Sequence, residues 1–290
     1  MLSFRAKLPA LVTIGLTTVL AVTIMLVAIS WTGVISLTNT QLIPRYEFVG
    51  MTQYLRLFDT ERFHVAFSNL FLYGACFITI ALIFGFVLAI MVDQRIRLES
   101  LFRTIFLYPL SMSFIVTGLA WQWFMNPTLG LQHFVRGLGF PDFTFDWLIN
   151  PDKAIYALVI AAVWQSSGLV MAILLAGLRG IDRDIWKAAA IDGIPAWRTY
   201  VSIVLPMLRP MVMTCVVLLS MAVVKAYDLV VALTRGGPGN SSDLPAKFVI
   251  DLTFERANIG MASAAAVMLL VTTIAVVAPY VAYSFHKLRR

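Results

Sequence analysis

Long uninterrupted apolar stretches dominate the chain. A helix across the bilayer core needs about 20 apolar residues. Six runs meet this length: Leu11–Trp31, Leu70–Val92, Ile105–Met125, Ala154–Leu178, Met211–Leu233 and Met261–Phe285. Only the fifth run contains charged residues, Lys225 and Asp228. We therefore expect an all-α membrane protein with six transmembrane helices, the first being an uncleaved span and not a signal peptide.

The composition supports this interpretation. Hydrophobic residues make up 60% of the 290 residues, charged residues only 13%, and the mean hydropathy is +0.86. Soluble domains are roughly 25% charged, so the composition excludes a disordered chain and argues strongly against a water-soluble globule. The two cysteines, Cys76 and Cys215, lie inside apolar runs. We interpret them as small packing residues and not as a disulfide.

The distribution of charge predicts the orientation. The formal net charge is +7. The N-terminus, the second and fourth loops between spans and the C-terminal tail hold 13 of the 22 Lys and Arg residues, against 8 on the opposite side. Because bases gather on the cytoplasmic side of membrane proteins, we expect both termini in the cytoplasm. The positive charge therefore needs no nucleic-acid partner, and basic patches interleaved with aromatic residues are absent from the sequence.

Two outer segments, Ser36–Asn69 and Asn126–Lys153, are too long to be simple turns. Both are rich in Pro, Asp and aromatic residues, so we interpret them as lids or docking surfaces. The three histidines lie singly outside the spans, at His64, His133 and His286. We therefore expect no metal site and no catalytic residue.

The cytoplasmic loop Gly180–Pro206 has the pattern of two short helices joined by a turn. Asp182 is a good N-cap for the first helix, and Gly193 suits the left-handed residue that ends it. Pro195 suits the first position of the second helix. The sequence therefore predicts a helix–glycine–helix unit between the fourth and fifth spans.

The side chains of this unit suit docking to another protein. Small residues at Ala188–Ala190 would let a second backbone approach closely, and Trp197 and Tyr200 could fill a pocket. The alternative is an amphipathic segment that lies on lipid. The spacing alone favours neither.

The same loop resembles the EAA loop of ABC importer permeases, which reads Glu-Ala-Ala, three residues, Gly, nine residues, then Ile-x-Leu-Pro. The spacing matches at every step, and an Asp before the glycine is typical of the carbohydrate branch. The usual Glu is replaced by Lys187, which affects the salt bridge expected with the ATPase but not the helix geometry. By this resemblance, the ATPase-coupling residues are Lys187, Ala188, Ala189, Asp192, Gly193, Trp197, Ile203, Leu205 and Pro206.

A second motif agrees with the first. Tyr227-Asp228, then Leu233-Thr234-Arg235-Gly236-Gly237-Pro238, then Gly260 and Ala264 resemble the region between the fifth and sixth spans of maltose-type sugar permeases. The Leu-Thr-x-Gly-Gly-Pro stretch is typical of the first of the two permease subunits. The resemblance covers most of the chain from about residue 60 and is strongest from 180 to 265.

The resemblance implies a type I importer permease fold, multi-pass in a bacterial or archaeal cytoplasmic membrane. It implies an N-terminal helix with its outer loop, 1–60, and a five-helix core, 61–290, with the coupling loop 180–206. The implied partners are a second permease, a pair of ATPase subunits, an extracytoplasmic sugar-binding protein and membrane lipid. The chain lacks a Gly-x-x-x-x-Gly-Lys-Ser/Thr phosphate loop. We therefore expect no enzyme activity and no cofactor in this chain, with ATP and Mg²⁺ on the ATPase partners.

Polar residues inside the spans are candidates for the substrate pathway, because they are costly in a bilayer unless they are paired or face a cavity. These candidates are Trp164, Gln165, Ser166, Ser220, Lys225, Tyr227 and Asp228. Other interpretations stay open. Lys225 and Asp228 could pair with each other, and Ser and Gln could bridge helices. The aromatic residues at 121–123 suit an interfacial belt, and Pro109 suits a helix kink.

The function implied is the permease of an importer for a mono- or oligosaccharide. One alternative is a glycerol-3-phosphate permease, which would favour several cations on the pathway, whereas only Lys225 lies inside a span. A secondary transporter would favour midplane acids or inverted repeats, and only Asp228 qualifies. An intramembrane enzyme would need a buried nucleophile with a base, but no His or Glu lies in any span.

Overall fold

The computed structural model describes residues 4–41, 46–94 and 97–288, with side chains from residue 14 to residue 278 within these ranges. Several residues named from the sequence therefore have no described side chain: Arg5, Lys7, Arg45, Arg95, Lys287, Arg289 and Arg290, which were counted for the orientation, and His286. The described residues are helical, apart from one isolated bridge between Thr38 and Phe48 and the connecting loops. The chain divides into two compact units.

The first unit comprises Met1–Thr60 and Val249–Val271. It holds α1 (Phe4–Ile35), α2 (Thr52–Phe58), the end of α13 (Pro245–Phe254) and the first part of α14 (Ile259–Leu288). The loop after α1 is held against the start of α14, because the Gly260 N–H donates to the Thr40 carbonyl at 2.9 Å. A Cβ at Gly260 would collide with the Thr38 carbonyl oxygen, so this approach requires glycine.

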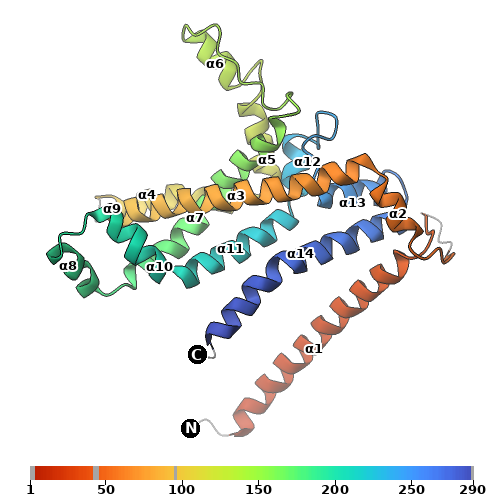
Figure 1. Ribbon diagram of the computed structural model, residues 1–290, viewed down its shortest axis with the longest axis horizontal. Helices are drawn as coiled ribbons and strands as arrows, with labels where there is room; N and C mark the ends of the chain where they lie inside the picture. Colours follow the sequence, from red (N-terminus) through yellow and green to blue (C-terminus); the bar gives the residue numbers. More distant parts are fainter. Residues whose placement is uncertain (1–3, 42–45, 95–96, 289–290) are drawn as a thin grey trace. The chain divides into compact units, whose positions relative to one another are not determined.

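The second unit comprises Glu61–Phe248 and Thr272–Arg290. Its centre is the pair of long helices α3 (Glu61–Asp93) and α7 (Ala154–Arg179), which pack along each other (Figure 1). A Cβ at Gly85 of α3 would lie 2.5 Å from Val170 Cγ1 of α7, so the missing side chain permits close packing. Large side chains of both helices, including Phe77, Leu158 and Met171, are fully buried.

The third apolar run does not form the continuous span that the sequence predicts. The run begins inside α4 (Glu99–Leu107) and continues through a 3₁₀ turn (Tyr108–Ser111) and α5 (Phe114–Phe124). The segment Glu99–Ser111 is bent by 102° from α5. Pro109 lies inside the turn, as the predicted kink requires. Ser113 then caps α5 by accepting from the Val116 N–H at 3.3 Å, so a proline and a new N-cap end one helix and start another.

The fifth run is also interrupted. Between α7 and this run lie α8 (Arg183–Ile191), α9 (Ala196–Thr199), a π-helical turn (Tyr200–Val204) and α10 (Leu205–Met207). The segment Ala196–Met207 is bent by 73° from α11 (Arg209–Val224). A break of three residues separates α11 from α12 (Asp228–Leu233), so the expected continuous span over Met211–Leu233 is wrong.

Four helical segments among the described residues are long and apolar enough to cross a membrane: Ile14–Ile35, Glu61–Asp93, Ala154–Arg179 and Ile259–Ala278. Counting each bent pair as one span gives up to six, in agreement with the six runs in the sequence. The segment Asn126–Lys153, which the sequence predicts on the outer side, contains a further short helix, α6 (Leu131–Gly137). Its Lys153 pairs with Asp146 at 2.9 Å, and this hydrogen bond lowers the pKa of the Asp146 carboxyl below its usual value.

Candidate functional site

The coupling segment, defined here as Gly180–Pro206, has the local geometry that the sequence predicts. The Asp182 side chain accepts from the Asp184 N–H at 3.0 Å and so caps α8. Gly193 has φ +66°, and the Ile194 N–H donates to the Ala189 carbonyl at 3.0 Å. This is the glycine-terminated end expected for a helix followed by a sharp turn. Pro195 precedes α9 as its N-cap residue, one position earlier than predicted.

Large apolar side chains of the coupling segment are exposed. Ile191 is 85% exposed and Trp197 is 69% exposed, whereas Ala189 is buried. Lys187, which stands at the usual Glu position, forms an exposed ion pair with Asp184 at 2.7 Å. Of the other predicted coupling residues, Ala188, Asp192, Gly193 and Pro206 are exposed and Ile203 and Leu205 are half-buried.

Tyr200 faces its own chain and does not extend the exposed surface as the sequence suggested. Its ring packs edge-on against Trp186, with the centroids 5.3 Å apart. Its hydroxyl accepts from Gln94 Nε2 at 3.2 Å, at the end of α3. Tyr200 therefore connects the coupling segment to α3, and Trp197 is left as the exposed aromatic residue.

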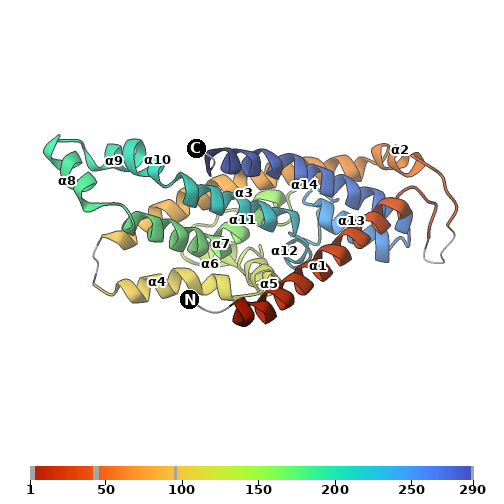
Figure 2. The same ribbon diagram turned by 90° about the horizontal axis from the view of Figure 1, so that it is seen from below.

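A second connection lies beside the first. Arg179, the last residue of α7, pairs with Glu99 of α4 at 2.7 Å and with Asp93 of α3 at 3.6 Å. One guanidinium thus joins three helix ends where the coupling segment begins (Figures 1 and 2). Patterns in the sequence do not reveal this cluster, because Arg179 lies 80 residues from Glu99 and still further from Asp93.

The candidates on α7 lie beside the break in the third run. Trp164 packs edge-on against Trp121 of α5, with ring centroids 6.0 Å apart. Gln165 Nε2 donates to the carbonyl of Met112 at 2.8 Å, within the break. Trp121 therefore lies beside a pathway candidate, and the belt interpretation of residues 121–123 stays a prediction.

Two polar oxygens near this break are buried without a partner. Gln165 Oε1 and Thr117 Oγ1 make no hydrogen bond within the part of the chain that the structure describes. Ser166 is also buried. An unsatisfied buried polar group costs about 1–3 kcal/mol, so a hydroxyl or a water that reached these oxygens would be bound favourably. Thr117 could not be predicted from the sequence, because a single threonine in an apolar run carries no signal of its own.

The candidates Lys225 and Tyr227 lie in the break between α11 and α12, and Asp228 is the first residue of α12. The backbone turns tightly there, with the Tyr227 N–H donating to the Lys225 carbonyl at 2.7 Å. Lys225 and Asp228 are both exposed. Within residues 46–94 and 97–278 neither side chain takes part in an ion pair. The mutual pairing that the sequence left open is therefore not formed, and both charges are available to a ligand.

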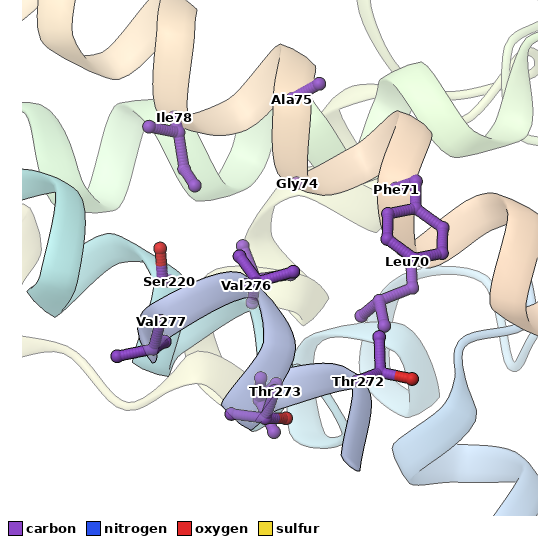
Figure 3. Close-up of a pocket in the computed structure, with 12 residues that line it drawn as sticks. Leu70, Phe71, Gly74, Ala75, Ile78, Ser220, Thr272, Thr273, Val276 and Val277 are labelled. Carbon is purple, nitrogen blue, oxygen red and sulfur yellow. The ribbon is translucent and has the colours of Figure 1, made fainter. Parts of the chain in front are cut away.

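Ser220, the remaining candidate, lines a cavity of about 220 Å³ between α3, α11 and α14. Figure 3 shows Gly74 and Ile78 of α3 on one side of it, and Ser220, Thr273 and Val276 on the other. The lining is almost entirely apolar. A sugar needs several hydrogen-bonding groups, so this cavity does not suit one, and neither Trp121 nor Trp164 lines it.

The motif Gly236-Gly237-Pro238 folds into a compact turn after α12. Gly236 has φ +81°, a conformation that favours glycine. The Ser242 hydroxyl donates to the Gly237 carbonyl at 2.7 Å and to Thr234 Oγ1 at 2.8 Å, and so links the two ends of the turn.

Among the residues that the structure describes, no cluster of three or more His, Cys, Asp or Glu residues could hold a metal ion.

A comparison with protein families decides between the possible classes of membrane protein. The family model described as "binding-protein-dependent transport system inner membrane component" matches residues 78–286. The chain belongs to this family. This permease is therefore a multi-pass inner-membrane subunit that works with a binding protein, and it is not the catalytic subunit of its transport system.

Relatives of this permease cover nearly its whole length. A probable ABC transporter permease of Pyrococcus horikoshii is 36% identical over 96% of this chain and 94% of its own. The xylose/arabinose import permease XacH of Haloferax volcanii is 34% identical over 84% and 77%. The trehalose/maltose permease MalF of Thermococcus litoralis is 30% identical over 82% and 80%.

The fold of this permease also occurs in a solved structure. A chain from a bacterial ABC transporter involved in the import of the acidic polysaccharide alginate superimposes with a TM-score of 0.82 at 18% identity. The match covers 97% of this chain and 96% of that chain. The all-α importer permease fold expected from the sequence is thus confirmed.

Proposed function

We propose that this permease is one of two permease subunits in an ABC importer for a neutral sugar. The observation that supports the substrate class is the similarity, over more than 80% of this chain, to permeases named for xylose/arabinose and for trehalose/maltose. The Gly-Gly-Pro motif favours the first-permease position, and a second permease supplies the other half of the pathway. ATP and Mg²⁺ bind to two ATPase subunits, and this chain holds no cofactor.

The coupling segment is the contact with the ATPases in this proposal. Exposed Ile191 and Trp197 give it an apolar surface that a groove on a partner can bury. Binding drives a change only if its affinity differs between the two states of the permease. The ATPase dimer therefore couples to transport by binding the coupling segment in one arrangement more tightly than in the other.

The sugar pathway in this proposal runs past the breaks in the third and fifth runs. Trp121 and Trp164 offer aromatic faces, and the partnerless oxygens of Thr117 and Gln165 offer hydrogen bonds. Lys225 is the only cation within the six apolar runs. A phosphorylated substrate is best held by more than one cation or a bidentate Arg, so a neutral sugar is favoured over glycerol-3-phosphate.

Uptake of radiolabelled sugars tests the proposal. Cells lacking this chain should lose uptake of a pentose or a glucose disaccharide, by at least about tenfold, and regain it with the gene. Glycerol-3-phosphate uptake should be unaffected. Loss of glycerol-3-phosphate uptake alone would refute the substrate class. Uptake that is driven by a proton gradient and persists after depletion of ATP would instead support a secondary transporter.

A further inference from the structure

An ion pair is buried at the outer end of α3. Arg62 Nε lies 2.6 Å from Asp243 Oδ2, and the two side chains are only 11% and 0% exposed. The guanidinium carbon also lies 5.4 Å from the centre of the Phe248 ring. Arg62 stands in the first turn of α3, whereas Asp243 ends the loop that follows α12. The pair therefore joins two elements that are 181 residues apart in sequence.

The side chain of Asn69, two turns further along α3, binds backbone carbonyls of the same loop. Its Nδ2 donates to the carbonyls of Ser241 at 2.8 Å and Asp243 at 3.0 Å. We call Arg62, Asn69 and the loop segment Ser241–Asp243 the outer latch. Two side chains of one rigid helix thus fix both the carboxylate and the backbone of the loop.

Gly236 of the Gly-Gly-Pro motif lies against the ion pair. A Cβ at Gly236 would lie 3.1 Å from Asp243 Oδ1 and 3.3 Å from Lys247 Cδ. A side chain there would press on the carboxylate that Arg62 binds. The glycine therefore makes room for Asp243, and the Ser242 hydroxyl closes the turn around it.

A buried ion pair is a poor source of net stability, because desolvating two charges offsets most of their attraction. Its best-supported use is to fix one arrangement of the elements that carry it. Here the fixed element is α12, since the loop begins directly after Leu233 and Thr234 accepts the Ser242 hydroxyl. The latch thereby holds α12, with Asp228 at its start, in one position relative to α3.

The opposite end of α3 carries the contacts with the coupling segment. Gln94, the residue after α3, donates to Tyr200 of this segment, and Asp93 pairs with Arg179, the residue directly before it. Between latch and coupling segment α3 is one unbroken helix of 33 residues, about 50 Å long at 1.5 Å per residue. Figure 1 shows this helix running from α8–α10 at one end to the α12 loop at the other.

We propose that α3 transmits the movement of the coupling segment to the outer half of the pathway, and that Arg62 and Asp243 are the positioning residues that make α12 follow it. Energetic coupling between distant sites needs an element whose arrangement both sites influence. The long helix, held by polar contacts at both ends, is that element. The proposal rests on the ATPase-coupling function proposed above.

The test uses the whole importer in lipid nanodiscs, with ATP hydrolysis measured with and without sugar-loaded binding protein. R62Q should leave basal hydrolysis within about twofold of wild type, and should reduce the stimulation by binding protein about tenfold, a typical size for allosteric coupling. R62K, which keeps a positive charge facing Asp243, should retain at least about half of the stimulation. R235Q, an exposed arginine of the same loop, is the matched control and should behave as wild type.

A double mutant separates transmission from local damage. Y200F removes the hydroxyl that accepts from Gln94 at the other end of α3. If both residues act through α3, the double mutant Y200F/R62Q should lose no more stimulation than the more severe single mutant. Multiplying losses, or wild-type stimulation in R62Q, would overturn the proposal. If R62Q failed to assemble, N69L would test the role of the latch instead, because it removes only the two hydrogen bonds of the Asn69 amide. N69L should then lose stimulation about threefold, and full stimulation would overturn the proposal.

The two proposals fail in different ways. If no sugar-loaded binding protein stimulates the wild-type complex, the proposed function is wrong. If wild type is stimulated and R62Q is stimulated equally, only the role of the latch is wrong.

Discussion

Thr117 and Gln165 are singled out at the residue scale by a missing contact. Both carry an oxygen that is buried without a hydrogen-bond partner in the described chain, although native proteins satisfy nearly all such atoms. Both lie near the Trp121–Trp164 contact. In the pathway proposed above, a sugar hydroxyl that reaches these oxygens would supply the missing hydrogen bonds.

Thr117→Val tests this explanation, because it keeps the shape of the side chain and removes the hydroxyl. We expect the unfolding temperature of the purified complex to stay the same or rise, since an unsatisfied group is lost. The sugar concentration for half-maximal uptake should rise about threefold to tenfold, equivalent to about 0.7–1.4 kcal/mol. T214V, at an exposed threonine whose hydroxyl bonds to Pro210, should change neither value. Unchanged uptake in T117V would remove Thr117 from the pathway.

Individual residues were predictable from the sequence where their role is local. Asp182 and Gly193 act on backbone groups within five residues of themselves, so residue type and spacing were sufficient. Arg62 and Asp243 are 181 residues apart, and nothing in the sequence pairs them. The sequence also could not predict that Lys225 and Asp228, three residues apart, stay unpaired, because the helix breaks between them.

At the scale of elements, the coupling segment depends on its glycine turn. Gly193 has φ +66°, and nothing lies within 4 Å of the position its Cβ would take. A side chain there meets no neighbour, so the backbone conformation alone limits substitution. Proline is locked near φ −65° and cannot adopt this turn, whereas Asn tolerates it.

We therefore expect Gly193→Pro to insert and assemble with the partner permease but to abolish uptake. Gly193→Asn is the matched control and should keep most of the uptake, while G193A should destabilise the turn by about 1 kcal/mol. Membrane abundance by immunoblot and sugar uptake are the two measurements. Normal uptake by G193P would contradict the role of this segment in coupling.

The breaks within the third and fifth runs could not be predicted from hydropathy. Apolar length predicted that these segments lie in the membrane, but it contains no information about the direction of the backbone. Pro109 and Ser113 were local signals for a break. The bend of 102° itself depends on packing, such as the contact of Gly118 in α5 with Ala232 in α12, where a Cβ would come within 2.5 Å of its neighbour.

For the whole molecule, the orientation in the membrane remains a prediction from the distribution of bases. It requires the coupling segment inside and the Gly-Gly-Pro loop outside. Single cysteines at Ile191 and Asn240, both exposed, would test it after Cys76 and Cys215 are replaced. We expect a membrane-impermeant maleimide to label N240C in intact cells, and I191C only after permeabilisation. The reverse pattern would invert the topology.

The apolar cavity lined by Ser220 has a consequence for the mechanics of the whole permease. An apolar cavity contributes few contacts for the volume that it occupies, so raised hydrostatic pressure favours any arrangement that closes it. With about 220 Å³ between α3, α11 and α14, compression acts on the same helices that the ATPases are proposed to move. The transport rate of this permease should therefore depend on pressure, even where its sugar and nucleotide sites are saturated.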